Sequence, residues 1–255
     1  MFDPKNFRLD GQVALVTGAG AGIGRGIAEM FAGAGAAVVV SDLKQEAADA
    51  VAKDIVAAGG KATGIACNVT KEADLAAAVD AAVSNFGKLT ILVNNAGGGG
   101  PKPFDMPMED FRWAYELNVF SVFRLCQLAA PHMEKAGGGA ILNITSMSGD
   151  NKNQRMASYA SSKAAESHLT RNIAFDLGPK NIRVNAIAPG ATRTAALQSV
   201  LTPEVEATML KHTPLKRLGE PEDMAHAALF LCSPAASWVS GQVLTVSGGG
   251  VQELD

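Results

Sequence analysis

The sequence predicts an α/β protein, with residues 1–255 as one domain built on a doubly wound, seven-stranded parallel sheet with helices on both faces. Short runs of apolar and β-branched residues, typical of buried strands, alternate with helical patterns along the whole chain. A glycine-rich turn joins the first of these runs to the first helix. The 255 residues, 47% of them hydrophobic, suffice for one large core, and no repeat or linker interrupts the pattern.

Composition and charge argue against a nucleic-acid-binding, membrane-spanning or metal-binding protein. The formal net charge is -3, with no basic block and few aromatic residues, so a nucleic-acid partner is not expected. The first ten residues lack the apolar core of a signal peptide, and no apolar run approaches the roughly 20 residues of a membrane span. Three separated cysteines and four scattered histidines have no metal-ligand spacing. We therefore expect a soluble, cytoplasmic protein with no metal site and no membrane partner.

The first unit of the chain has the order strand, glycine turn, helix and strand within about 30 residues. Its strands are residues 13–17 and 36–42, and the turn carries Gly18, Gly22 and Gly24. Glycines let the backbone turn tightly and approach a pyrophosphate, and the start of the next helix offers free N–H groups to that anion. Glycines alone would be weak evidence, but this context predicts a dinucleotide site.

Asp42 ends the second strand of this unit. A carboxylate there can accept hydrogen bonds from the ribose hydroxyls of NAD, and it would repel the additional phosphate of NADP. Lys44 and Arg25 are near in sequence and could soften that preference. Asp42 could instead cap the following helix, but we favour the ribose role and hence NAD.

The remaining elements alternate in the same way. Further strands are predicted over 61–69, 90–97, 140–145, 182–190 and 242–246. Helices are predicted over 45–58, 70–86, 108–135, 159–177 and 221–232. The second of these is predicted to start at Thr70. The third is predicted to be one long helix or a pair bent at Pro131. An irregular, partly helical stretch precedes Leu218.

Three side chains with a common chemistry occur between residues 146 and 163. Tyr159 and Lys163 are four residues apart on a predicted helix and so share one face. Ser146 follows a buried strand, at the sheet edge where open α/β sheets bind ligands. Free tyrosine ionises only near pH 10, but a neighbouring ammonium favours the phenolate, and a serine hydroxyl can hold an alcohol or carbonyl oxygen. The trio therefore suits proton exchange with an alcohol or ketone.

Five motifs, in order and spacing, resemble the short-chain dehydrogenase/reductase family over essentially the whole chain. They are TGAGAGIG at 17–24, NNAG at 94–97, Ser146, YASSK at 159–163 and PGATRT at 189–194. The resemblance implies a Rossmann-type domain with strand order 3-2-1-4-5-6-7 and a nicotinamide cofactor. It also implies a fourth catalytic residue, Asn118 in the long helix, which would support the water path by which the proton leaves. Asn118 could also bond its own helix backbone, which is compatible with that role.

The resemblance also implies roles for the other residues. Tyr159 would take the proton from the substrate hydroxyl while hydride passes to the nicotinamide, Ser146 would bind the substrate oxygen, and Lys163 would favour the phenolate and bind the nicotinamide ribose. Asn68 stands where many relatives have Asp, and its amide oxygen can still accept from the adenine amino group. Besides Tyr159 and Lys163, the implied cofactor contacts are Gly18, Gly22, Ile23, Gly24, Asp42, Asn68, Val69, Asn95, Ala96, Gly97, Pro189, Gly190, Thr192 and Thr194.

Four stretches resemble the bile-acid-oxidising hydroxysteroid dehydrogenases of this family: NNAGGGGPKPFDMP at 94–107, SYASSKAA at 158–165, LFLCSPAASWVSGQ at 229–242 and LTVSGGGVQEL at 244–254. The four-glycine run before PKPFDMP is more specific than the catalytic signature, which every member of the family carries. That resemblance implies NAD-dependent oxidation of a bile-acid 7α-hydroxyl to a ketone. Substrate contacts are expected at Gly99, Ser146, Asn151 and Tyr159, with Met147 nearby. The stretch at about 191–215 could close over the site as a lid or pack as an ordinary amphipathic helix. Arg193 could meet the acidic tail or be solvated.

Two other functions stay open at this point. The same catalytic residues would serve another NAD-dependent short-chain alcohol dehydrogenase or a ketoacyl reductase, although Asp42 and the loop at 97–107 speak against a biosynthetic reductase. An NAD-binding redox-sensing module is a remote alternative, because a sensor has no need of the Tyr159 phenolate. The family usually forms tetramers, so a homotetramer through the long helices and the carboxyl-terminal segment is expected.

Overall fold

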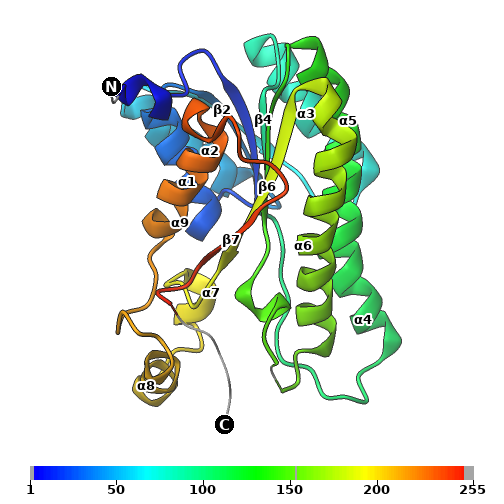
Figure 1. The fold of residues 1–255 in the computed structure, drawn as a ribbon, viewed down its shortest axis with the longest axis vertical. Helices are drawn as coiled ribbons and strands as arrows, with labels where there is room; N and C mark the ends of the chain where they lie inside the picture. The colour runs from blue at the N-terminus through cyan, green and yellow to red at the C-terminus, as the bar shows by residue number, and fades with distance from the viewer. Residues whose placement is uncertain (1–2, 153, 250–255) are drawn as a thin grey trace.

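Seven strands form one sheet in the order β3-β2-β1-β4-β5-β6-β7, and every neighbouring pair is parallel. The computed structural model describes residues 3–152 and 154–249 (Figure 1). The sheet and the strand order predicted from the sequence are confirmed. The strands are β1 (Val13–Thr17), β2 (Ala37–Asp42), β3 (Lys61–Ala66), β4 (Ile91–Asn94), β5 (Gly139–Ile144), β6 (Ile182–Pro189) and β7 (Val243–Val246).

Helices cover both faces of the sheet, so its central strands are apolar throughout rather than alternating. In β1, Ala14 and Val16 belong to one buried cluster and Val13 and Leu15 to the other. Figure 1 shows α1, α2 and α9 on one side and α3, α5 and α6 on the other. These helices are α1 (Gly22–Gly33), α2 (Gln45–Ala57), α3 (Glu72–Phe86), α5 (Ser121–Lys135), α6 (Ala157–Leu177) and α9 (Pro221–Cys232).

The predicted start of α3 at Thr70 is wrong by two residues. The helix begins at Glu72, with Lys71 as its N-cap. Thr70 instead donates from its backbone N–H and its hydroxyl to the side-chain oxygen of Asn68, at 3.1 and 2.8 Å. This local turn competes with the helix for Thr70, as short polar side chains commonly do.

The long helix predicted over 108–135 is interrupted, but not at Pro131. It consists of α4 (Met108–Tyr115), the π-helical turn η2 (Glu116–Phe120) and α5, and Pro131 lies inside α5. The interruption falls where Asn118 turns toward the loop after β4. Such π turns inside helices often mark functional sites.

The segment from 191 to 218 crosses the end of the sheet with little packing of its own. Its helices α7 (Ala195–Gln198) and α8 (Pro203–Lys211) contain no buried residue. In Figure 1 they lie below the sheet, away from the layers of helices. The short 3-10 turns are η1 (Pro4–Phe7), η3 (Met147–Gly149), η4 (Gly178–Lys180) and η5 (Pro234–Ala236).

Within the described residues, no helix combines the length and the apolar character needed to cross a membrane.

Candidate active site

A cleft of about 430 Å³ opens at the carboxyl ends of β1, β4, β5 and β6, where parallel sheets bind ligands. A larger groove of about 810 Å³ near Phe7 and Pro221 carries none of the predicted site residues. The predicted residues that line the cleft are Gly18, Gly22, Ile23, Asn95, Gly97, Gly99, Ser146, Tyr159, Lys163, Pro189, Gly190, Thr192 and Thr194. The structure therefore brings the glycine turn and the predicted catalytic trio into one space.

The glycine turn leads directly into α1, whose N-cap residue Ala21 has no side-chain cap. The first N–H groups of the helix are therefore open toward an anion. Asp42 supports the turn from β2, because its carboxylate accepts from the N–H of Gly20 at 2.9 Å and of Lys44 at 3.2 Å. The N-cap of α2 is Lys44, so Asp42 does not cap that helix. Arg25 pairs with two other carboxylates, which balance its charge.

A hydrogen-bonded clamp joins the ends of β1 and β4. The amide nitrogen of Asn95 donates to the carbonyls of Thr17 and Gly18, at 2.8 and 2.9 Å. In return, the hydroxyl of Thr17 accepts from the backbone N–H groups of Asn95 and Ala96, both at 3.0 Å. Thr17 was not predicted as a site residue, although its place immediately before the glycine turn could have indicated a role there.

Tyr159 and Lys163 point into the same cleft from α6, as their spacing predicted. Ser146 follows β5 and is 8% exposed, and its Oγ accepts from the N–H of Ser148 at 3.1 Å. That geometry leaves the hydroxyl proton of Ser146 free to donate. The Tyr159 hydroxyl has no hydrogen-bond partner within the described part of the chain. Both hydroxyl groups are therefore available to a substrate oxygen.

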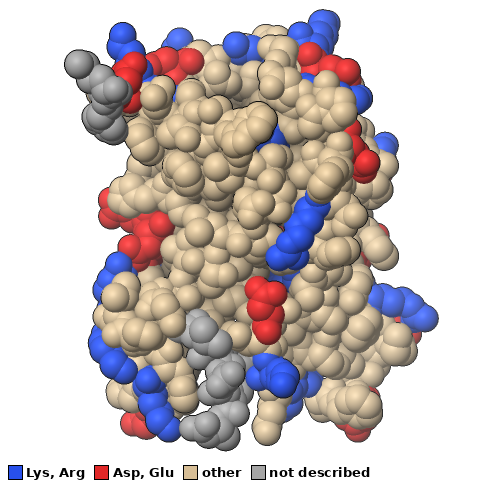
Figure 2. Space-filling model, in the orientation of Figure 1, with Lys and Arg blue, Asp and Glu red and all other residues tan. Residues whose placement is uncertain are grey.

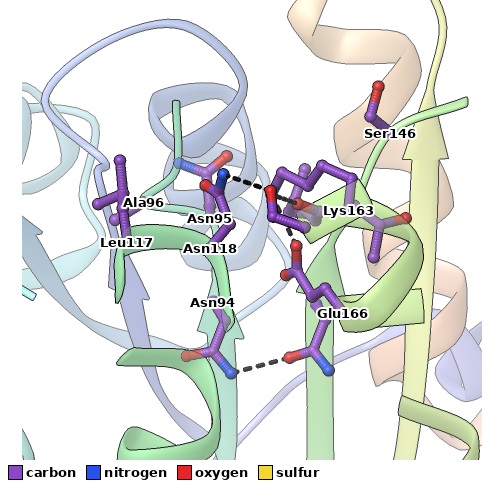
Figure 3. Close-up of polar contacts among 12 residues, drawn as sticks. Asn94, Asn95, Ala96, Leu117, Asn118, Ser146, Lys163 and Glu166 are labelled. Carbon is purple, nitrogen blue, oxygen red and sulfur yellow. Dashed lines mark hydrogen bonds and ion pairs between the residues drawn. The ribbon is translucent and has the colours of Figure 1, made fainter. Parts of the chain in front are cut away.

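Lys163 is 4% exposed, and its ammonium is held by two acceptors. Its Nζ donates to the carbonyl of Ile144 at 2.8 Å and to Oε2 of Glu166 at 2.7 Å. Burial raises the pKa of Glu166 to about 7, against the opposing effect of the Lys163 charge. Figure 3 shows Glu166 between Lys163 and Asn94. The sequence reasoning missed Glu166, although a carboxylate three residues after Lys163 faces the same side of a helix.

Asn118 bonds the loop after β4 rather than its own helix. Its side chain accepts from the N–H of Gly98 at 3.0 Å and donates to the Gly98 carbonyl at 2.9 Å and to Oγ of Ser162 at 3.0 Å. A Cβ built at Gly97 would lie 3.0 Å from Asn118 Oδ1 and 3.1 Å from Lys163 Nζ. The absence of a side chain at Gly97 thus leaves space bordered by both groups.

Some predicted residues lie outside the lining of the cleft. Asn68 and Val69 follow β3, and Asn151 follows η3, where its N–H donates to the Met147 carbonyl at 3.2 Å. The side chain of Arg193 pairs with Glu206 at 2.9 Å and Glu220 at 3.2 Å, so a substrate carboxylate would compete with both. The other predicted residues outside the lining are Gly24, Asp42, Ala96, Asn118 and Met147.

The arrangement fits a nicotinamide dinucleotide. One end of the cleft offers the open helix start with Asp42 beside the turn, and the other end offers Ser146, Tyr159 and Lys163. These groups suit a pyrophosphate, a ribose and a reacting alcohol, respectively. Among the residues that the structure describes, no three His, Cys, Asp or Glu side chains gather as a metal site.

The fold and this cleft are those of a nicotinamide-dependent oxidoreductase, and the protein belongs to the short-chain dehydrogenase/reductase family. Residues 18–250 match the family model described as enoyl-(acyl carrier protein) reductase. The chain is 68% identical, over all 255 residues of both proteins, to the 7alpha-hydroxysteroid dehydrogenase of Escherichia coli (strain K12).

The chain is also similar to a solved structure and to a more distant relative. A solved structure of a 7 alpha-hydroxysteroid dehydrogenase complexed with NADH and 7-oxo glycochenodeoxycholic acid is 67% identical, with a TM-score of 0.97 and full coverage of both chains. The 3-oxoacyl-(acyl-carrier-protein) reductase FabG of Thermotoga maritima (strain ATCC 43589 / DSM 3109 / JCM 10099 / NBRC 100826 / MSB8) is 37% identical over 243 residues, covering 95% of this chain and 98% of that one.

The loop at Gly99 lies against the tyrosine ring, which generates a first prediction. A Cβ at Gly99 would lie 2.6 Å from Cδ2 of Tyr159, and Gly99 has a φ of +140°. Gly99→Ala should therefore displace the ring or the loop and lower kcat/KM by about 100-fold, the order of loss expected for misplacing a reacting group by about 1 Å. Steady-state oxidation kinetics measure the loss.

Gly100→Ala is the matched control, because a Cβ at that position would meet nothing within 4 Å. It adds the same methyl group one residue further along the same loop. Equal losses in the two variants would show that general loop stiffening, rather than contact with Tyr159, causes the effect.

The raised pKa of Glu166 generates a second prediction, on stability. Between its ordinary value of 4.5 and about 7, the folded state keeps a proton that the unfolded state has lost. The free energy of unfolding should therefore fall as pH rises through this window. Glu166→Gln cannot ionise and lacks this component, so the Tm of the native protein should decrease relative to the variant between pH 5 and pH 8.

Asp176→Asn makes the same chemical change on the exposed side of α6 and serves as the control. Its Tm should follow that of the native protein across the whole range. A constant difference between the native protein and Glu166→Gln from pH 5 to pH 8 would contradict the prediction.

Proposed function

We propose that this protein is an NAD-dependent 7α-hydroxysteroid dehydrogenase, which reversibly oxidises the 7α-hydroxyl of bile acids to the 7-ketone. The observation that carries the proposal is the gathering of Ser146, Tyr159 and Lys163 in the same cleft as the glycine turn. The full-length 68% identity to a relative with this name supports the choice of substrate.

Each member of the trio has a distinct task in the reaction. The Ser146 hydroxyl donates to the substrate oxygen and fixes its position, while the Tyr159 phenolate accepts the hydroxyl proton. As the O–H bond breaks, the carbon–oxygen double bond forms and the C–H bond releases hydride. When bound, NAD supplies the hydride acceptor. The Lys163 ammonium, held from behind by Ile144 and Glu166, favours the phenolate and keeps one N–H for a ribose hydroxyl.

Asn118 and Lys163 are proposed to carry the proton away from Tyr159. Both border the position that a side chain at Gly97 would occupy, at 3.0 Å from Asn118 Oδ1 and 3.1 Å from Lys163 Nζ. Asn118 is fixed there by three hydrogen bonds, so its amide oxygen can orient a water without moving.

Asp42 is proposed to select NAD over NADP. Its carboxylate stands beside the glycine turn, where an additional phosphate on the adenosine ribose would meet a negative charge. Arg25, one of the two nearby cations that could soften this preference, is held by Glu29 at 2.8 Å and Asp54 at 3.0 Å.

We propose that the chain works as one domain in which residues 191–215 form a lid for the steroid rings. Leu197, Leu201, Met209 and Leu210 are only partly buried, and Val200 is exposed. A bile acid in the cleft would give these side chains an apolar surface to cover. The reducing cytoplasm is the proposed location, and the three buried free cysteines suit it.

A homotetramer is the proposed assembly, supported by apolar side chains that the single chain leaves in water. Phe175 on α6 and Trp238 after η5 are 85% and 99% exposed. Trp113 on α4 and Phe123 on α5 are exposed as well. Figure 2 shows a broad uncharged area around the segment between α9 and β7. The carboxyl-terminal segment was also expected to take part in the tetramer. Its last residues, 250–255, lie outside the described part of the chain.

The assembly is tested by placing a charge on the exposed helix face. Phe175→Glu should convert the tetramer into smaller species, because a buried unpaired carboxylate at an interface is costly. Sedimentation velocity measures the masses. Val56→Glu is the control. Val56 is an exposed residue of α2, on the opposite face of the sheet from Phe175, so this variant should stay tetrameric. A monomeric native protein would contradict the proposal.

The function is tested with two bile acids that differ only in the configuration of the 7-hydroxyl. Purified protein should form NADH with the 7α epimer and not with the 7β epimer, and it should strongly prefer NAD to NADP. Oxidation of neither epimer, together with reduction of a ketoacyl thioester, would favour the reductase alternative.

Tyr159→Phe tests the mechanism in the same assay. Removing the phenol oxygen should abolish measurable oxidation, while NADH binding, followed by fluorescence titration, should stay within about threefold because the other contacts remain. Substantial NAD-dependent oxidation in this variant would show that Tyr159 is not the base.

A further inference from the structure

The ammonium of Lys163 lies against a carboxylate that the mechanism above does not require. Glu166 is fully buried, and its Oε2 accepts from Lys163 Nζ at 2.7 Å. Its other oxygen, Oε1, has no hydrogen-bond partner among the described residues. A carboxylate left half-satisfied in a dry site is costly, so its stabilisation depends largely on Lys163.

The groups that surround this pair from the neighbouring elements are neutral. On α5, burial raises the pKa of Cys126 to about 12, so the thiol stays protonated. β4 and β5 contribute the amides of Asn94 and Asn143, which bond each other at 2.8 Å. Asn143 in turn donates to the hydroxyl of Thr170 at 2.9 Å. Lys163 is the charged group acting on Glu166, and Tyr159 is the ionisable group one helical turn before Lys163.

We propose that Glu166 is a positioning residue that sets the net charge which Lys163 presents to Tyr159, and thereby raises the pH range in which the enzyme oxidises its substrate. The inference deepens the proposed function, because it assigns a counter-ion to the acid–base pair of the same site. Glu166 is hydrogen-bonded to Lys163 and does not line the cleft, so it acts through Lys163.

The direction of the effect follows from the signs of the charges. An isolated ammonium favours the phenolate strongly, whereas an ammonium paired with a carboxylate favours it less. The same carboxylate helps Lys163 keep its proton at alkaline pH. With Glu166 ionised, both ionisations therefore occur at higher pH than they would beside a neutral group.

The phenol can be titrated without any substrate. The chain has two tyrosines, and Tyr115 stacks on Phe111 in α4, outside the site. In a Tyr115→Phe background, the ultraviolet difference absorbance of tyrosinate reports Tyr159 alone. Adding Glu166→Gln keeps an acceptor for Lys163 but removes the charge, so the titration midpoint should fall by about one pH unit. Coincident midpoints would overturn the inference.

The rate of bile-acid oxidation gives a second readout. The acidic and alkaline limbs of the kcat/KM profile should both move to lower pH in Glu166→Gln. On the part of the acidic limb above about pH 7, where the native Glu166 is ionised, the variant should be several-fold faster than the native protein. Glu166→Met removes the charge and the acceptor together and should show the same acidic shift, and Asp176→Asn should show none. Profiles that superimpose would overturn the proposal.

The two readouts separate this inference from the proposed function. If the native protein oxidises no bile acid, the proposed substrate is wrong, but the tyrosinate titration still decides the role of Glu166. If oxidation is normal and the titration midpoint does not move, the substrate assignment stands and the role of Glu166 is wrong.

Discussion

The clamp between Thr17 and Asn95 is the constraint on which the rest of the site depends. The sheet order reverses at β1, with β2 on one side and β4 on the other, so the chain leaves these strands toward opposite faces and a crevice opens between them. Asn95 ties the end of β4 to the glycine turn at 2.8 and 2.9 Å. These two bonds hold the glycine turn, which faces the dinucleotide, in a fixed position relative to the loop after β4, which lies beside the proposed catalytic residues. The loop after β4, which Asn118 bonds at Gly98, is therefore fixed relative to the turn by hydrogen bonds between side chains and backbone.

A second set of buried polar contacts makes the catalytic half rigid. Lys163 joins α6 to β5 through the Ile144 carbonyl, and Asn118 joins the π turn to Gly98 and to Ser162 on α6. Buried polar groups in native proteins are nearly always satisfied, and each of these bonds also orients a side chain with a proposed catalytic role. The π turn at Glu116–Phe120 follows from this arrangement, because it rotates Asn118 toward the loop after β4.

The sequence predicted what depends on local pattern and short spacing. Short apolar runs separated by helical patterns predicted the parallel sheet. The four-residue separation of Tyr159 and Lys163 predicted that both side chains face the same cleft. The interruption at η2 was not predicted, because a tertiary contact causes it while Pro131 offers a stronger local signal. Thr17 was missed because its partner is 78 residues away, and no local rule pairs them. Glu166 had the right spacing but the ordinary appearance of a solvated helix residue.

The residues around the cleft and the segment that contains α7 and α8 differ in how well they are packed. The clamp and the predicted catalytic residues Asn118 and Lys163 are held by hydrogen bonds to the strands and loops around them, whereas α7 and α8 bury no side chain. Ion pairs from Arg193 to Glu206 and Glu220 hold this segment, but partly exposed pairs contribute little. Ordering the segment must therefore draw on apolar area that the ligand itself supplies. In the proposed mechanism, steroid binding would close the lid over Ser146, Tyr159 and Lys163, which already share one cleft, so the chemistry would not wait for the trio to assemble.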